Sequence, residues 1–314
     1  MSWAEPRSLN RATLRKKRAP RDDADPVHTS TIDHANLFPE TMLPLLGISD
    51  LTLRELWAKK VIMGLFLVST LVLLFVSFAL NLDVVEGSLA SLRLFGSEAN
   101  TDMSLQDLVI AVESVVAGAA YWLGVLLALF SAAPLFTTLL DKGHITLLLS
   151  KPISRVQLLA GHVVGVWGAM LVLAVYLLGG VWLLMSIKSG VWNPRFLFAI
   201  GLVVALFAVM YGVVVLLGAW TESTALSLIT TYGLIVISLV LAGVKQITPQ
   251  LSEMGAAVFW TAYHTLPNFA EVTKIVGTLA KGDPVANWYP FVSSLLFGIV
   301  CYGIGAVIFA RRDF

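Results

Sequence analysis

Residues that could carry catalysis are few and scattered in this chain of 314 residues. The sequence contains no G-x-x-x-x-G-K-[ST] phosphate loop, no H-E-x-x-H zinc pair and no G-x-S-x-G nucleophile turn. An active site or metal centre needs several such groups to converge. The histidines stand apart, at positions 28, 34, 144, 162 and 264, and the single cysteine, Cys301, lies in an apolar run. We therefore predict no catalytic residue, no metal site and no cofactor in this chain.

One acidic residue, Glu113, borders a long apolar stretch. A charged group in the middle of a bilayer costs roughly 2.5 to 3.5 kcal/mol on insertion scales and usually serves a function. Glu113 is therefore a candidate for a substrate or proton pathway. The alternative is a position at the outer interface, because Asp107 lies only six residues earlier.

The elements that position these residues must be embedded in a bilayer. Hydrophobic residues make up 57% of the chain, charged residues only 13%, and the mean hydropathy is +0.83, so the apolar surface exceeds what a soluble domain can bury. About 20 apolar residues in a helix cross the hydrocarbon core, and six stretches of at least 22 residues lack Asp, Glu, Lys and Arg. We predict an all-α integral membrane protein with six helical spans, at about 61–82, 110–136, 156–187, 196–220, 223–244 and 286–310.

Basic residues predict how these spans are oriented. Fifteen Lys and Arg fall in residues 1–60, in the loop between the second and third spans and at the C-terminus, and only six fall in the opposite loops. Because cytoplasmic loops carry the excess of basic residues, we place both termini in the cytoplasm. The N-terminus has no apolar core followed by a small-residue cleavage site, which predicts that no signal peptide is removed.

Residues 254–270 form a further uncharged stretch, interrupted by His264, Pro267 and Asn268. A seventh span here would move the last residues of the chain to the outer side, away from the other basic segments. We therefore predict a re-entrant or interfacial helical pair on the outer face, for which a short, broken apolar stretch is typical.

The segment before the first span divides into two parts. Residues 1–49 are predicted to form a basic, largely disordered cytoplasmic tail. In residues 50–60, Thr52 to Glu55 fits a capping box and the apolar side chains share one face, which predicts an amphipathic helix on the cytoplasmic surface. The alternative is a simple basic flank of the first span. The candidate interface residues are Arg54, Glu55, Trp57 and Lys59.

The loop between the second and third predicted spans can form a short helix. Gly143 lets the chain turn, residues 144–150 make about two helical turns, and Pro152 prevents their continuation. Ser154 can then cap the next helix, with Gln157 at the reciprocal position. The result is a short helix held crosswise between two long ones, which suits the transmission of force from a bound partner.

This loop resembles that of the type-2 ABC exporter (ABC-2) permeases, which reads approximately as acid-x-Gly-Thr-Ile, then Leu-Leu-Leu-Ser-x-Pro-Ile-Ser-Arg and a Leu-Leu pair. In that family the loop is the coupling helix that docks into a groove of an ATPase subunit, so the resemblance implies the same role here. The sequence departs from the pattern at His144, where Thr is common, and at His162, where Lys is usual. The residues implied to couple to the ATPase are Asp141, Gly143, His144, Ile145, Leu147, Leu148, Ser150, Lys151, Pro152, Ser154 and Arg155.

Two further segments are similar to these permeases, namely 263–269 (YHTLPNF) and 309–314 (FARRDF). Leucine-proline-asparagine and Arg-Arg-Asp sequences recur there, particularly in the branch that includes the permease for maturation of the nitrous-oxide-reductase copper site. The resemblance covers the chain from about residue 50 to its end and implies an ABC-2 (type V exporter-like) fold.

The resemblance implies a multi-pass permease of the bacterial cytoplasmic (inner) membrane that exports an unidentified substrate. Its partners would be two ABC ATPase subunits, which bind ATP and Mg²⁺, a second permease, identical or homologous, and the lipid bilayer, with no nucleic acid. Two other classes stay open: a non-transporting scaffold or assembly factor, and an intramembrane enzyme, which the shortage of converging polar groups disfavours. Secondary transport is less favoured, because no two-half repeat with broken helices is evident.

Other residues favour structural roles. His162 is expected near the cytoplasmic end of its span and not as a ligand. Gly161, Gly165 and Ala169 form a small-residue ridge, which predicts close helix packing within the subunit, with a contact between subunits as the alternative. Tryptophans near both predicted membrane faces fit interfacial belts, namely Trp57, Trp182, Trp192, Trp220 and Trp288.

Overall fold

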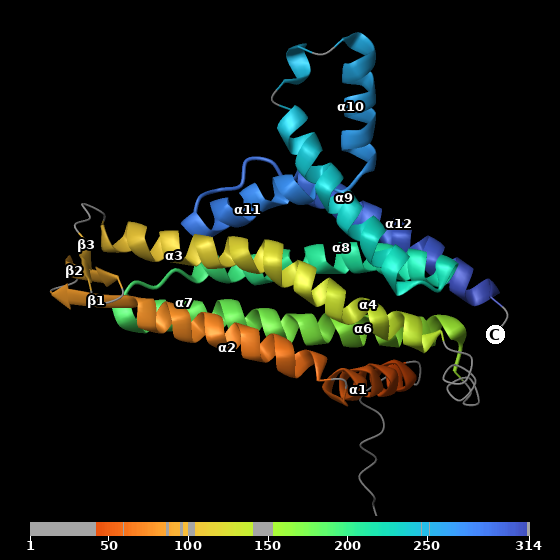
Figure 1. Ribbon diagram of the computed structural model, residues 1–314, viewed down its shortest axis with the longest axis horizontal. Helices are drawn as coiled ribbons and strands as arrows, with labels where there is room; N and C mark the ends of the chain where they lie inside the picture. Colours follow the sequence, from red (N-terminus) through yellow and green to blue (C-terminus); the bar gives the residue numbers. More distant parts are fainter. Residues whose placement is uncertain are drawn as a thin grey trace, which may run out of the picture. The chain divides into compact units, whose positions relative to one another are not determined.

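The computed structural model describes residues 42–58, 60–85, 88–94, 97–99, 104–140, 153–245, 247–250 and 252–312. All of these belong to one unit, Glu40–Phe314. Helices dominate the described part (Figure 1). The predicted basic tail lies outside the described residues, apart from residues 42–49.

Five helical segments of the described chain are long and apolar enough to cross a membrane. They are Leu105–Leu139, Arg155–Ser189, Pro194–Thr221, Thr224–Val244 (α9) and Tyr289–Arg311 (α12). The first three are composite: α3 (Leu105–Ala119), the π-helical turn η2 (Ala120–Gly124) and α4 (Val125–Leu139); α6 (Arg155–Ala174), the π-helical turn η3 (Val175–Gly179) and α7 (Gly180–Ser189); and the 3₁₀ turn η4 (Pro194–Leu197) and α8 (Phe198–Thr221). A bent pair at the start, α1 and α2, brings the number to six, in agreement with the predicted fold.

The first predicted span is preceded by a helix that turns away from it. The axes of α1 (Met42–Ala58) and α2 (Val61–Ala79) meet at 68°. The predicted start of this helix near residue 50 was wrong, and so was the capping box at Thr52. Thr52 lies inside α1, where its hydroxyl donates to the carbonyl oxygen of Ile48 at 3.0 Å. The helix begins earlier because the preceding sequence is apolar and Pro44 falls in the first turn, where proline is tolerated.

A small sheet follows α2 and was not included in the all-α prediction. The strands β1 (Leu80–Val85), β2 (Ser88–Leu94) and β3 (Ser97–Ala99) pair antiparallel in that order. Polar and apolar residues alternate from Ser91 to Leu94 in β2, as is typical of a strand. The predicted helical class holds for the membrane-spanning segments, and the sheet belongs to the connection between two of them.

Two short helices of 13 residues each precede the last span, α10 (Glu253–Thr265) and α11 (Phe269–Lys281), after a 3₁₀ turn, η5 (Thr248–Gln250). Within the described residues of this region neither helix is long enough to be a seventh span, which agrees with the prediction of a helical pair. Its re-entrant or interfacial position on the outer face stays a prediction. The pair extends further than the uncharged stretch, to Lys281. The break between the helices falls at Pro267, which cannot donate a backbone hydrogen bond.

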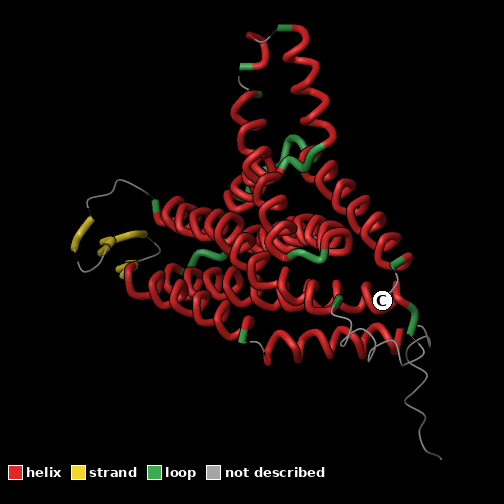
Figure 2. Tube along the Cα trace, turned by 45° about the vertical axis from the view of Figure 1, so that its right-hand side comes forward, coloured by secondary structure: helices red, strands yellow, loops and turns green. Residues whose placement is uncertain are grey.

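α8 forms the centre of the helical packing and is buried along most of its length. It packs closely against α12, because small residues stand where the two helices meet. A Cβ added at Gly298 would lie 3.1 Å from the Cα of Val209, and one added at Gly305 would lie 3.2 Å from the Cα of Leu216. Such close approach is typical of helix pairs in membranes. α4, α6, α9 and α11 also contact α8. Figure 2 shows the packing of the helices, in red, from a second direction.

Candidate functional site

The segment predicted to couple to an ATPase lies almost entirely outside the described residues. Its start is bounded by α4, which ends at Leu139, and its end by α6, which begins at Arg155. The roles of the following residues therefore stay predictions: Asp141, Gly143, His144, Ile145, Leu147, Leu148, Ser150, Lys151 and Pro152.

The predicted cap at the end of this segment is confirmed. Ser154 Oγ accepts a hydrogen bond from the backbone N–H of Gln157 at 3.2 Å. The side-chain oxygen of Gln157 accepts one in return from the N–H of Ser154 at 3.0 Å. This capping box satisfies two amides that the first turn of a helix leaves unpaired. The capping box therefore fixes where α6 begins, directly after Ser154.

Three charged residues connect the ends of several spans beside this cap, and we name them the basic-end cluster: Arg155, Glu222 and Arg312. The guanidinium of Arg155 donates to the carbonyl oxygen of Ala310 at 3.3 Å and also to that of Arg312. Arg312 in turn donates to the carboxylate of Glu222 and to the carbonyl oxygen of Ala219. The start of α6, the end of α12 and the turn between α8 and α9 are thereby connected.

The small-residue ridge on α6 receives α1. A Cβ added at Gly165 would lie 2.9 Å from the Cβ of Thr52 and 3.0 Å from the carbonyl oxygen of Ser49. Ala169 of the same ridge packs with Leu56 of α1 in a small buried cluster. The predicted close packing within the subunit is therefore confirmed for these two positions of the ridge.

His162 is a buried link between helices, with 1% of its surface exposed. Its Nε2 lies 3.0 Å from the hydroxyl of Tyr211 on α8, and its Nδ1 lies 3.5 Å from the hydroxyl of Thr52 on α1. His162 lies in the second turn of α6, near the end of the span where it was expected, and it is buried there because α1 covers this part of α6. In the part of the chain that the structure describes, no three His, Cys, Asp or Glu residues come together as metal ligands.

The candidate interface residues on α1 differ in their surroundings. Arg54 forms an exposed ion pair with Asp50, one helical turn earlier, at 2.9 Å. Trp57 is 54% exposed, and Glu55 is half-buried. Lys59 lies outside the described residues. Contact of these side chains with an ATPase stays a prediction.

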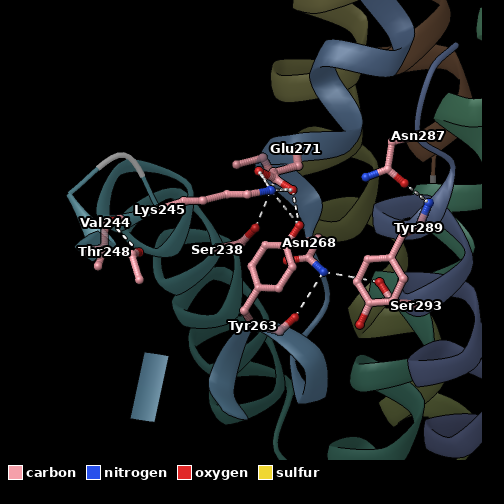
Figure 3. A network of polar contacts seen from close by, with 11 residues as sticks. Ser238, Val244, Lys245, Thr248, Tyr263, Asn268, Glu271, Asn287, Tyr289 and Ser293 are labelled. Carbon is pink, nitrogen blue, oxygen red and sulfur yellow. Dashed lines mark hydrogen bonds and ion pairs between the residues drawn. The ribbon is translucent and has the colours of Figure 1, made fainter. Parts of the chain in front are cut away.

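A second polar centre lies at the far end of α9, about 30 Å along that helix from Glu222. The ammonium group of Lys245 lies 2.8 and 3.1 Å from the two carboxylate oxygens of Glu271 and 3.0 Å from the hydroxyl of Tyr263 (Figure 3). The Tyr263 hydroxyl also donates to Glu271. We name these three residues the Lys245 network. It joins the end of α9 to α10 and α11.

The charged forms of the Lys245 network stabilise each other. Burial by itself would raise the pKa of Glu271, but hydrogen bonds from Lys245 and Tyr263 and the charge of Lys245 outweigh it, so the pKa is lowered. For Lys245, burial acts to lower the pKa, but hydrogen bonding to Glu271 and Tyr263 and the nearby carboxylate raise it overall. The carboxylate and the ammonium group are therefore both charged at neutral pH.

The hydrogen bonds of Asn268 give a structural reason for the leucine-proline-asparagine sequence before α11. Its side-chain amide donates to the carbonyl oxygen of Tyr263 and to the hydroxyl of Ser293, each at 3.2 Å (Figure 3). Its backbone N–H donates to Ser294 at 3.0 Å. With 3% of its surface exposed, Asn268 holds the break between α10 and α11 against α12.

Glu113 lies inside the helical packing and not at its surface, because none of its surface is exposed. One carboxylate oxygen accepts a hydrogen bond from the side chain of Asn193 at 2.8 Å, and Asn193 also donates to the carbonyl oxygen of Ala280 at 2.8 Å. The other oxygen has no hydrogen-bond partner among the described residues. Glu113 therefore connects α3, through the turn before α8, to the end of α11.

Sequence reasoning did not find the Lys245 network. Lys245 and Glu271 are 26 residues apart, with a helix between them, and each charge stands next to residues that look like an ordinary loop or a helix flank. The available signal was the break at Pro267, which places Glu271 in the first turn of a new helix.

Comparison with known families identifies the class of protein. The family model for the ABC-2 family transporter protein matches residues 49–314. The chain therefore belongs to the ABC-2 family of transporter proteins. No curated protein sequence matches the chain.

Membership of this family defines the general role. The chain is a multi-pass membrane protein and a permease component of an ABC transporter. The family works with an ABC ATPase, and its membrane component is not itself catalytic. The resemblance based on the 141–155 loop is confirmed at the level of the family, and the more specific branch stays a prediction.

Proposed function

We propose that this permease couples ATP hydrolysis by a separate ATPase subunit to the export of a substrate across the bacterial inner membrane. The observation that carries the proposal is the family match over residues 49–314, in a chain whose sequence contains no phosphate-binding loop. The energy source must then lie in a partner. ATP and Mg²⁺ belong to that partner.

The proposed docking segment is 141–155, together with the exposed face of α1. The capping box at Ser154 fixes the end of this segment to α6. A displacement imposed on the segment would reach α6 directly. Arg155 would transmit the displacement to the end of α12. Arg312 and Glu222 would then transmit it to the turn between α8 and α9. In this proposal the basic-end cluster transmits a displacement of the docking segment to the ends of several spans.

We further propose that two permease subunits, identical or homologous, work with two ATPase subunits. The movement would switch the spans between inward-facing and outward-facing arrangements. In this scheme the Lys245 network keeps α9, α10 and α11 together as a unit, and Glu113 is a candidate residue of the pathway because one of its oxygens is buried without a partner among the described residues.

The proposal is tested by expressing the full-length permease with its ATPase partner and purifying the complex in lipid nanodiscs. We expect the ATPase to co-purify and its hydrolysis rate to depend on the permease. Deletion of residues 144–150 should abolish that dependence. Arg195→Ala is the matched control, because Arg195 bonds to Gly282 far from the basic-end cluster, and it should retain coupling.

Two results together would overturn the proposal. One is a purified permease that never retains an ATPase. The other is transport that continues unchanged after residues 144–150 are deleted.

A further inference from the structure

A deep groove runs between α2 on one side and α3, η2 and α4 on the other, with α6 and η3 at its base. Its cavity volume is about 600 Å³. Residues on its rim are strongly exposed, such as Val115 at 71% and Leu123 at 63%. Residues on its floor are buried, such as Ala120 at 7% and Leu178 at 0%. The cavity is therefore open on one side, between its exposed rim residues, and closed at the bottom.

The groove exists because α2 packs against the helices at the base of the groove and only lightly against α3 and α4. Near the start of α2, Ile62 packs with Leu135 and Ala169. In the middle of α2, the hydroxyl of Thr70 lies 3.0 Å from that of Tyr176 in η3. In the second half of α2, the side chain of Leu73 lies beside Gly180, where an added Cβ would be 3.0 Å from it. The carbonyl oxygen of Ser77 also accepts a hydrogen bond from Lys188. Along the groove α2 therefore stands away from α3 and α4.

The lining is almost uniformly apolar. Of the described residues that line the groove, only Ser69 and Gly124 are not hydrophobic, and none is charged. The floor is made of small and branched residues, including Ala120, Ala128 and Ala174. A ligand held here must be hydrocarbon along its whole contact length, because a polar group would lose its water without gaining a partner.

Both π-helical turns of the described chain lie against the groove. η2 contributes Ala120, Leu123 and Gly124, and η3 contributes Leu177 and Leu178. π-helical turns inside α-helices are rare and occur frequently at functional sites. The position of both turns beside the groove is an observation independent of the volume of the cavity.

The dimensions select one kind of occupant. The lining residues on α3, η2 and α4 run from Ala111 to Ala128, which at 1.5 Å per residue is about 25 Å. A volume of about 600 Å³ over that length, with about 1.4 Å added on each side for the radius of the water molecule that defines it, gives a channel about 8 Å wide. A helix with its side chains is about 10 to 12 Å across and does not fit. A single hydrocarbon chain does, since packed carbon atoms lie about 3.5 to 4 Å apart.

We propose that this groove binds the hydrocarbon chain of an amphiphile drawn from the bilayer, and that such an amphiphile is the substrate class of the transporter. The assignment of the amphiphile as the substrate rests on the proposed function, whereas the binding of its hydrocarbon chain rests on the groove alone. The groove lies at the depth of the hydrocarbon core, because its residues come from the middle of the spans. An acyl chain can therefore enter sideways without crossing water.

The test uses a long-chain fatty acid that carries a photoactivatable diazirine near the end of its chain. The full-length permease, in complex with its ATPase in lipid nanodiscs, is irradiated with this probe, and labelled residues are mapped by mass spectrometry. We expect labels on α2, η2 and η3. Gly124→Leu fills the groove, where a new Cβ meets only Ala120 at 3.9 Å. It should lower labelling at least tenfold, the loss expected when about two methylene contacts are displaced.

Gly118→Leu is the matched control. Gly118 stands on the same helix, an added Cβ meets nothing within 4 Å, and the residue does not line the groove. It should label like the wild type. The probe should also stimulate ATP hydrolysis in the wild type and in Gly118→Leu, but not in Gly124→Leu.

Several results would overturn the inference. Equal labelling of the two variants, or labels spread evenly over all exposed apolar helices, would show ordinary contact with bulk lipid. Efficient cross-linking of Val115→Cys to a second copy, without labelling of the groove, would show that another subunit covers it. Labelling of the groove with hydrolysis indifferent to the probe would overturn the assignment as substrate. The proposed function fails separately, if the ATPase does not co-purify while the groove is still labelled.

Discussion

The two polar centres at opposite ends of α9 are built in different ways. In the basic-end cluster, charged side chains mainly bind backbone carbonyl oxygens, and the carboxylate that joins them, Glu222, is 60% exposed. In the Lys245 network, Glu271 is 7% exposed and accepts hydrogen bonds from two side chains. Exposed ion pairs contribute little to stability, whereas removing one partner of a buried pair is costly. We therefore expect the contacts of the basic-end cluster to change more readily than those of the Lys245 network, which should stay rigid.

The strongest test of this difference is Glu271→Gln, which leaves Lys245 and Tyr263 without the carboxylate. Loss of one partner from a buried pair costs about 3 to 5 kcal/mol, and because the Lys245 side chain is 37% exposed we expect about 2 kcal/mol here. The measurement is thermal unfolding of the purified protein in detergent. Lys274→Gln, an exposed position on the same helix, should change stability by less than about 0.5 kcal/mol. Equal effects of the two variants would contradict the expected rigidity.

The same network predicts how stability depends on pH. The lowered pKa of Glu271 means that its contribution is fully present above the ordinary value of 4.5 and is lost as the pH falls through the lower value of the folded protein. The raised pKa of Lys245 means that its contribution is present below 10.5 and is lost only at higher pH. Unfolding followed between pH 3 and 7 should therefore show an acid loss of stability that is smaller in Glu271→Gln.

An effect of similar size is expected where α1 rests on α6. Gly165→Ala would bring a methyl group within 3.0 Å of the backbone oxygen of Ser49, and such overpacking costs about 1 to 3 kcal/mol. Gly168→Ala on the same helix meets nothing within 4 Å and should be neutral or slightly stabilising. The comparison is made by thermal unfolding and by protease cleavage of α1. If both variants behave like the wild type, α1 does not pack on the ridge in solution.

The smallest expected effect on stability is at the cap of α6. Ser154→Ala removes one acceptor of the capping box and should cost about 1 kcal/mol. We expect a larger effect on coupling than on stability, because this residue fixes the end of the 141–155 segment. Ser252→Ala removes a comparable cap from α10, far from that segment, and should leave coupling unchanged. The measurement is permease-dependent ATP hydrolysis for the two variants.

Several features could be predicted because they depend on local sequence. Charge-free runs longer than a bilayer crossing indicate the spans, the serine and glutamine at 154 and 157 indicate a capping box, and Pro267 indicates a break. Each of these follows from residues that are neighbours in the chain, where backbone chemistry decides the outcome.

The features that escaped prediction depend on distant residues. The partners in the Lys245 network come from three helices, and their pairing is decided by how α9, α10 and α11 pack. The start of α1 at Met42 was missed because Thr52 offers a plausible cap, whereas contact with Gly165 and His162 makes it an interior residue. The groove depends on where α2 does not touch its neighbours, which no local pattern indicates.

The most direct test of the central claim is a photocross-link from the 141–155 segment. The photoreactive amino acid benzoyl-phenylalanine is placed at Leu147 of the full-length permease and, as a control, at Leu89 in β2, on the connection predicted to lie outside the cell. Irradiation of intact cells should give a cross-link to the ATPase subunit from position 147 and none from position 89. Absence of an ATPase cross-link at 147 in an assembly that still transports, or labelling of position 147 from outside the cell, would contradict the account.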